Sequence, residues 1–229
     1  MKGMNWERFA GATGIGFVVL WVIAALVMGS PASYDDSGSS IVTWLQDNRR
    51  EILVGTILQG AAAIAYFWYL AALASRVREA GEARLGATLF GAGLIVAAVS
   101  TVSSLTIASL AYGIEQNTDG AIVKTFYDLA LTANPMIGWA AAAMALATAV
   151  ATLRGGVFPS WFGWLSVAGA AWFVLEGLAW ARDGFFAVDG AVTMIGLVVF
   201  LAWVLVGSAL LVQHASAAEP APRSAMAPM

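Results

Sequence analysis

The chain has 229 residues, of which 60% are hydrophobic and only 11% are charged. Soluble globular domains carry about 25% charged residues, so this chain lacks the charges that a water-facing surface needs. With a mean hydropathy of +0.80, the composition excludes a soluble enzyme, a nucleic-acid-binding protein and a disordered chain. It indicates an integral membrane protein, and the formal net charge of −3 is too small to indicate an anionic partner.

A helix that crosses a bilayer needs about 20 predominantly apolar residues, and six stretches of the sequence meet this requirement. They lie at residues 9–29, 52–75, 85–112, 122–153, 161–181 and 191–212. Because only short loops remain between them, we expect an all-α, polytopic membrane helix bundle over residues 1–213. Residues 214–229 are rich in Ala and Pro and lack apolar periodicity, which predicts a disordered tail.

The first stretch has an alternative interpretation as a cleaved signal peptide, with residues 30–32 (Ser-Pro-Ala) as the cleavage site. Its apolar run is longer than the roughly 7–15 residues of a signal-peptide core. The length therefore favours an uncleaved span, while cleavage stays the alternative.

The basic residues of the loops indicate the orientation, because cytoplasmic loops are enriched in Lys and Arg. On one side the six-span arrangement collects Lys2, Arg8, Arg76, Arg78, Arg84, Arg154 and Arg223. On the other it collects Arg49, Arg50, Lys124 and Arg182. The larger group predicts that both termini are cytoplasmic, and most acidic residues then lie on or near the outer side.

The longest predicted outer loop, residues 30–51, contains an amphipathic segment. Ile41, Trp44 and Leu45 recur at helical spacing, and Ser39 or Ser40 is a suitable N-cap. We expect a short helix on the outer surface of the membrane. An alternative is that this helix forms a lid over a binding site.

Three predicted spans begin alike, at residues 8, 84 and 161, which suggests three helical hairpins in a parallel repeat. Gly and Ala are common in all membrane helices, so chance resemblance is the alternative. Small residues also gather within spans, where they allow close helix packing: Gly11, Gly14, Gly16, Gly86, Gly91, Gly93 and the run at 140–143. They are suited to packing within the chain, or to homo- or hetero-oligomer contacts.

Cofactor and metal chemistry have few candidate ligands in this sequence. The chain has no cysteine and one histidine, His214, so Cys-ligated zinc, Fe–S clusters and multi-His metal sites are excluded within one chain. We also find no catalytic constellation, phosphate loop or pair of acids at helical spacing. The sequence predicts no cofactor, no metal site and no catalytic residue, and favours a protein that is not an enzyme.

Polar residues within the spans give the strongest functional signal, because an ionisable group in the membrane is costly. Glu176 lies near the outer end of the fifth span and Asp128 in the first turns of the fourth. Neutral polar residues fall at similar depth, and they complete the candidate ligand-binding set: Gln59, Ser104, Tyr127 and Asn134. We expect a polar pocket that opens outward and is lined by the second to fifth spans.

Each of these features also has a structural explanation. For Glu176 the alternatives are a hydrogen bond across helices and a position at the outer interface, both without a ligand. Asp128 suits the positive end of a helix dipole. Pro135 follows Asn134 and predicts a kink, because proline removes one helix hydrogen bond.

Several motifs resemble a known family of proteins. They are residues 48–55 (NRREILVG), 67–70 (FWYL), 74–78 (ASRVR), 126–129 (FYDL) and 158–165 (FPSWFGWL). This pattern, over most of residues 5–213, resembles uncharacterised six-span bacterial membrane proteins, mainly from actinobacteria, that are described as domains of unknown function. The resemblance implies six spans and the bacterial inner membrane, and it implies no activity, substrate or site residue.

Three functions are compatible with these observations. The first is a protein that binds or helps translocate a small ligand through the outward-facing pocket. The second is a structural or regulatory partner subunit of a membrane complex. The third and least favoured is a lipid-modifying enzyme with Glu176 as acid or base. The expected partners are the lipid bilayer and a small molecule, and no nucleic acid.

Overall fold

A computed structural model of the chain describes residues 6–116 and 118–217, and within these residues it is all-α. The described part contains eight helices and no strand: α1 (Trp6–Met28), α2 (Gly38–Asp47), α3 (Arg49–Glu79), α4 (Ala83–Gly113), α5 (Gly120–Leu131), α6 (Asn134–Gly155), α7 (Ser160–Gly177) and α8 (Ala191–Ala217). The all-α prediction is confirmed. Most of the predicted tail, with Arg223, and Lys2 at the other end lie outside the described residues.

Five segments are long and apolar enough to cross a membrane, which fits a transmembrane protein. They are Arg8–Met28, Arg49–Glu79, Ala83–Gly113, Gly120–Gly155 and Ala191–His214. The predicted span at 161–181 is not among them. Its helix, α7, has 18 residues and ends at Gly177, since the chain turns there into the loop that leads to α8.

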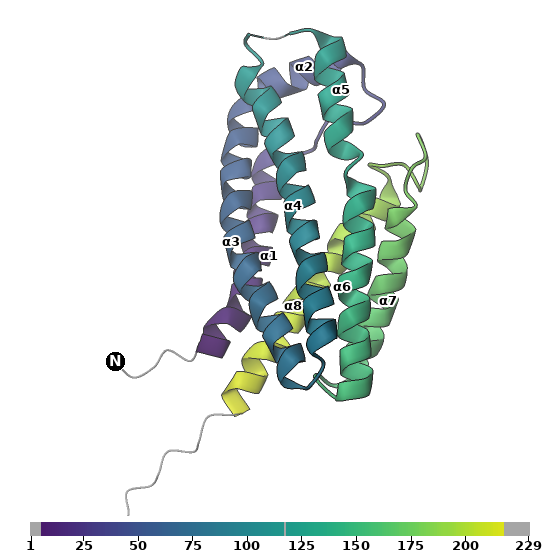
Figure 1. Cartoon of the computed structure of the whole chain (residues 1–229). Coiled ribbons are helices and arrows are strands. Elements are labelled where there is room, and N and C mark those ends of the chain that lie inside the picture. Colours follow the sequence, from purple (N-terminus) through teal and green to yellow (C-terminus); the bar gives the residue numbers. More distant parts are fainter. Residues whose placement is uncertain (1–5, 117, 218–229) are drawn as a thin grey trace, which may run out of the picture.

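Six of the helices form a closed ring in which chain neighbours are also neighbours in space. Contacts join α1 to α3, α3 to α4, α4 to α6, α6 to α7, α7 to α8 and α8 back to α1. The helices run alternately up and down the bundle (Figure 1). As a result, the start of α1, the end of α8 and the α3–α4 and α6–α7 turns lie at one end, and α2 and α5 lie at the other.

The predicted fourth span, 122–153, is two helices and not one kinked helix. The helix α5 ends at Leu131, and α6 begins at Asn134 with Pro135 in its first turn. Proline fits the first turn because the N–H that it lacks would have no helical partner there. The hydroxyl of Ser103 on α4 donates to the carbonyl oxygen of Ala130 at 2.6 Å, which satisfies a carbonyl next to the break.

The amphipathic segment of the first loop forms α2, as predicted, but its N-cap is Ser37 and not Ser39 or Ser40. The side-chain oxygen of Ser37 accepts from the backbone N–H of Ser40 at 3.2 Å. The buried face of α2 packs on α5, and together they form a small hydrophobic cluster, the end cluster: Ala32, Ile41, Val42, Leu45, Ile52, Ala111, Ile114, Val123 and Tyr127. This cluster closes one end of the ring.

Most of the small residues noted in the sequence lie in contacts between helices of the same chain. A side chain at Gly14 would overlap Ser208 and Tyr69, and one at Gly93 would overlap Leu70. Between ring helices, the closest backbone approach at a glycine joins α6 to α7, where a Cβ at Gly138 would lie 2.7 Å from the backbone nitrogen of Gly177. Glycine is required at this position because its neighbours are backbone atoms that cannot rotate away.

Gly138→Ala is expected to destabilise the protein by about 1–3 kcal/mol, since the added methyl group forces α7 away from α6. The matched control is Gly91→Ala on α4, where nothing lies within 4 Å of the added Cβ. That variant should be as stable as the parent or more stable by up to about 1 kcal/mol. Thermal unfolding of the detergent-purified proteins measures both, and equal stability of the two variants would contradict this packing.

Candidate functional site

A pocket of about 580 Å³ lies inside the ring, and all six ring helices contribute to its walls. Most of its lining residues fall in the half of each helix that is nearer to α2 and α5. The volume is within the range of roughly 300–1,000 Å³ found for small-molecule sites. Exposed apolar side chains at its margin show that it reaches the surface of the chain: Ile64, Phe67, Leu105 and Met194.

The floor of the pocket is aromatic. Phe17 of α1 lies 5.0 Å from Tyr66 of α3 and 6.3 Å from Phe200 of α8, measured between ring centroids. Phe173 of α7 continues this cluster at 6.1 Å from Phe200. The Tyr66 hydroxyl donates to the sulfur of Met144 at 3.4 Å, so the floor joins the pocket to the main core of the bundle.

Glu176 lies on the wall of this pocket, in the last turn of α7. It is 6% exposed and is the only acidic or basic side chain that is buried among the residues whose burial is described. Its carboxylate lies against Gly196 of α8, where a Cβ would overlap Oε2. An acid at the carboxyl end of a helix faces the negative end of the helix dipole, so the dipole does not explain this position.

The Glu176 carboxylate has no hydrogen bond or ion pair with any residue in the described part of the chain. Its neighbours in the pocket also present unused polar atoms. Gln59 Oε1 and Thr193 Oγ1 are buried and lack a hydrogen-bond partner. Asn134 differs, because its side-chain nitrogen donates to the carbonyl oxygen of Val188 at 3.4 Å.

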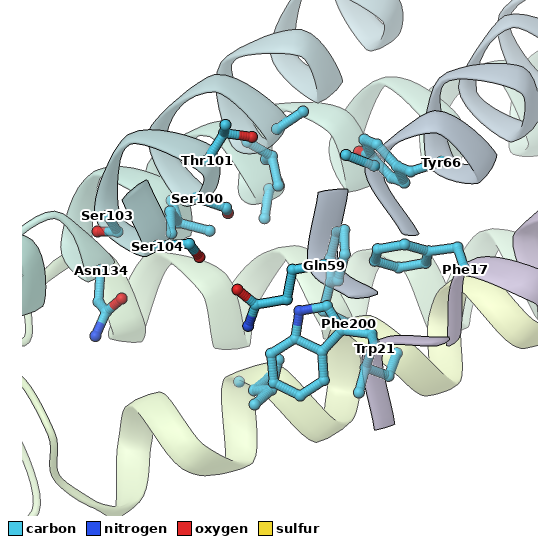
Figure 2. Close-up of a pocket in the computed structure, with 18 of the residues that line it drawn as sticks. Phe17, Trp21, Gln59, Tyr66, Ser100, Thr101, Ser103, Ser104, Asn134 and Phe200 are labelled. Carbon is cyan, nitrogen blue, oxygen red and sulfur yellow. The ribbon is translucent and has the colours of Figure 1, made fainter. Parts of the chain in front are cut away.

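Figure 2 shows how the polar residues are placed around the open space. The amide of Gln59 extends into the pocket from α3, beside the indole ring of Trp21. Ser100 and Ser104 face the same space from α4. The polar groups of α4 and Asn134 therefore lie on one side of the space, the labelled aromatic side chains lie on the other, and Gln59 lies between them.

Four of the six predicted site residues line this pocket: Glu176, Asn134, Gln59 and Ser104. The structure thus brings together residues of α3, α4, α6 and α7 that are up to 117 positions apart, from Gln59 to Glu176. That they bind a ligand stays a prediction.

Tyr127 and Asp128 do not line the pocket, and their placement there was wrong. Both belong to α5, which lies beyond the chain break and packs in the end cluster. The Tyr127 hydroxyl donates to the carbonyl oxygen of Ala32 at 2.6 Å. Asp128 pairs with Lys124 at 3.1 Å, and Lys124 also donates to the carbonyl oxygen of Tyr34 at 2.7 Å. Tyr127 directly, and Asp128 through Lys124, therefore hold α5 and the first loop together.

The prediction that only the second to fifth spans line the pocket was too narrow. The first helix contributes Phe17 and Trp21, and the last contributes Thr193, Gly196 and Phe200. No sequence pattern indicated that α8 returns to α1 and closes the ring. The α2 helix contributes no residue to the pocket wall, so the structure does not support a lid in this position.

The described residues contain no group of three or more His, Asp or Glu side chains placed to hold a metal ion. The pocket therefore offers one carboxylate, a few neutral polar groups and aromatic rings. Arg49 lies outside the pocket, at the α2 end, where it pairs with Glu115 at 3.3 Å and donates to the carbonyl oxygen of Ala111 at 3.2 Å.

No protein-family model, curated protein or solved structure matches the chain.

Tyr127→Phe is expected to destabilise the protein by about 1–3 kcal/mol, because it leaves the buried carbonyl of Ala32 without a donor. Tyr112→Phe removes the same hydroxyl from a side chain that is 72% exposed and should leave stability nearly unchanged. Thermal unfolding distinguishes the two variants. If Tyr127→Phe is as stable as the parent, Tyr127 does not anchor the first loop.

Proposed function

We propose that this chain is a six-span protein of the bacterial inner membrane that binds, or helps to translocate, a small ligand in the pocket inside its helix ring. The observation that carries the proposal is Glu176, a buried carboxylate without a partner on the wall of a pocket of about 580 Å³. A carboxylate in apolar surroundings is costly unless something pairs with it. A ligand in the pocket would supply the missing partner.

The proposal of six spans rests on α7 as the sixth. At about 1.5 Å per residue its 18 residues extend roughly 27 Å, close to the thickness of a bilayer core of about 30 Å. It lies along α6 in the bundle (Figure 1), and its exposed Trp161 and Trp180 suit the two membrane interfaces. The resemblance to six-span bacterial proteins favours the same count.

The parallel repeat of three hairpins belongs to the same proposal. The helices α1, α4 and α7 begin at Trp6, Ala83 and Ser160, so the spacing is 77 residues in both cases. Each is followed in the ring by a helix that returns to the end where the hairpin began. The basic loop residues support an orientation in which both termini are cytoplasmic and the end with α2 and α5 is outside.

Two alternative functions are less well supported. A partner subunit that covers the outside of the ring would not reach Glu176, which is 6% exposed and faces the interior. An enzyme that uses Glu176 would need a second reactive group, and the pocket wall among the described residues offers only hydroxyls, amides and aromatic rings. Ligand binding requires nothing beyond the groups that are present.

Cysteine labelling tests the pocket directly, because the natural chain has no cysteine and gives no background. We expect Ser104→Cys, on the pocket wall, to react with N-ethylmaleimide, which is small and crosses membranes, because the pocket reaches the surface beside Ile64 and Leu105. Ser39→Cys on the exposed surface of α2 should also react with a membrane-impermeant maleimide that is added outside intact cells. Ser166→Cys should not react, since Ser166 is fully buried beside Trp203.

The opposite surface supplies the control for orientation. Ala83→Cys, exposed at the start of α4, should react only after the membrane is made permeable. Labelling of Ala83→Cys in intact cells, with none at Ser39→Cys, would reverse the proposed orientation. A Ser104→Cys variant that is inert even to small maleimides in detergent would contradict an accessible pocket.

A further inference from the structure

The pocket has an unbalanced charge. Glu176 is the only charged residue among those that form its wall, and no Lys, Arg or His accompanies it there. Of the basic residues at the α2 end, Lys124 pairs with Asp128 and Arg49 pairs with Glu115, and neither Arg50 nor Arg182 lines the pocket. The described chain therefore brings one potential negative charge to the pocket and no positive charge.

Glycine at position 196 makes room for this carboxylate at the pocket wall. A side chain at Gly196 would overlap both the Oε2 and the carboxyl carbon of Glu176. Its absence lets the carboxylate lie against the α8 backbone, and no donor or cation of the described residues pairs with it there. A cationic group that enters the pocket would therefore not have to displace a protein partner.

The same pocket wall also holds unused atoms that accept hydrogen bonds. Gln59 Oε1 is a pure acceptor, and it is buried and unused. Thr193 Oγ1, also unused, can accept as well as donate. A protonated amine carries N–H donors and no acceptor, so it matches this set of acceptors as well as the charge of Glu176.

Aromatic rings supply the rest of the wall. Phe17, Tyr66, Phe173 and Phe200 form the floor, and Trp21 and Phe67 add two further rings to the wall. Cations are attracted electrostatically to the faces of such rings. The same rings give an apolar enclosure for the body of an organic molecule.

From these observations we propose that the pocket binds organic cations, namely protonated amines with an apolar, drug-sized body, and that Glu176 is the counter-ion. This inference rests on the proposed function, because it assigns the class of ligand to that same pocket. An organic anion would meet a carboxylate and no base. A neutral molecule would leave the negative charge of the carboxylate unbalanced.

The test uses the Ser104→Cys protein in detergent and measures its rate of reaction with neutral N-ethylmaleimide. Three probes of similar size are compared: the cation benzylammonium, its neutral carbon isostere ethylbenzene, and the anion benzenesulfonate. We expect the cation to slow the reaction at a concentration about tenfold or more below that needed for the neutral isostere. Benzenesulfonate should have no effect.

A second series of variants tests whether Glu176 is responsible for the protection by the cation. In Ser104→Cys combined with Glu176→Gln, protection by the cation should weaken about tenfold or more, to the level of the neutral isostere. The matched control is Glu115→Gln, the same change in a carboxylate that pairs with Arg49 outside the pocket, and it should leave protection unchanged. If Glu176→Gln does not fold, the comparison of the three probes on the Ser104→Cys protein still tests whether the pocket prefers a cation.

The outcomes separate the two proposals. Three results would overturn the cation assignment alone: equal protection by the cation and the neutral isostere, stronger protection by the anion, or no protection of a Ser104→Cys thiol that does react. A Ser104→Cys protein that N-ethylmaleimide cannot modify would overturn the accessible pocket and, with it, both proposals.

Discussion

A polar group inside a membrane-spanning bundle has to find its partner within the chain, because hydrocarbon supplies neither donors nor acceptors. Most of this bundle follows that constraint. The hydroxyls of Thr148 and Ser166 donate to carbonyl oxygens four residues earlier, and Ser166 also accepts from the indole N–H of Trp203 at 2.9 Å. A few neutral hydroxyls, such as that of Ser208, are buried without a partner, but a carboxylate costs far more than a hydroxyl when it is left alone. Glu176 is therefore the position at which the structure departs most from the constraint.

The ring of helices explains why this departure is located in a pocket. Large rings fill the centre of the ring in the half that contains the start of α1 and the end of α8, where Trp203 stacks on Phe162 at a centroid distance of 5.8 Å. At the opposite end the end cluster closes the ring, and the α7–α8 loop is tied in because Asp189 accepts from Ser33 and Tyr34, both at 2.9 Å. Between these two packed regions the helices carry serine, threonine, glycine and glutamine, which are too small or too polar to fill the centre. The pocket is the space that remains.

The sequence predicted the helical class and most helix positions, because apolar runs of about 20 residues are a strong signal. It also predicted the depth of the polar groups, and so placed Glu176, Gln59, Ser104 and Asn134 in one region. It misassigned Tyr127 and Asp128, because depth along a helix does not reveal that α5 and α6 separate at Thr132 and turn these side chains toward the first loop. It also missed Thr193 and Gly196, because the closure of α8 onto α1 is a long-range contact that leaves no periodic pattern.

The central claim is that the Glu176 carboxylate is kept for a ligand and contributes nothing to the stability of the chain. The most direct measurement is the unfolding temperature of Glu176→Gln in detergent, compared with Ser166→Ala, which deprives Trp203 of its buried acceptor. We predict that Glu176→Gln unfolds at the parent temperature or above it, and that Ser166→Ala unfolds earlier. A fall of about 4 °C or more for Glu176→Gln would show that the carboxylate holds the bundle together, and would contradict the account.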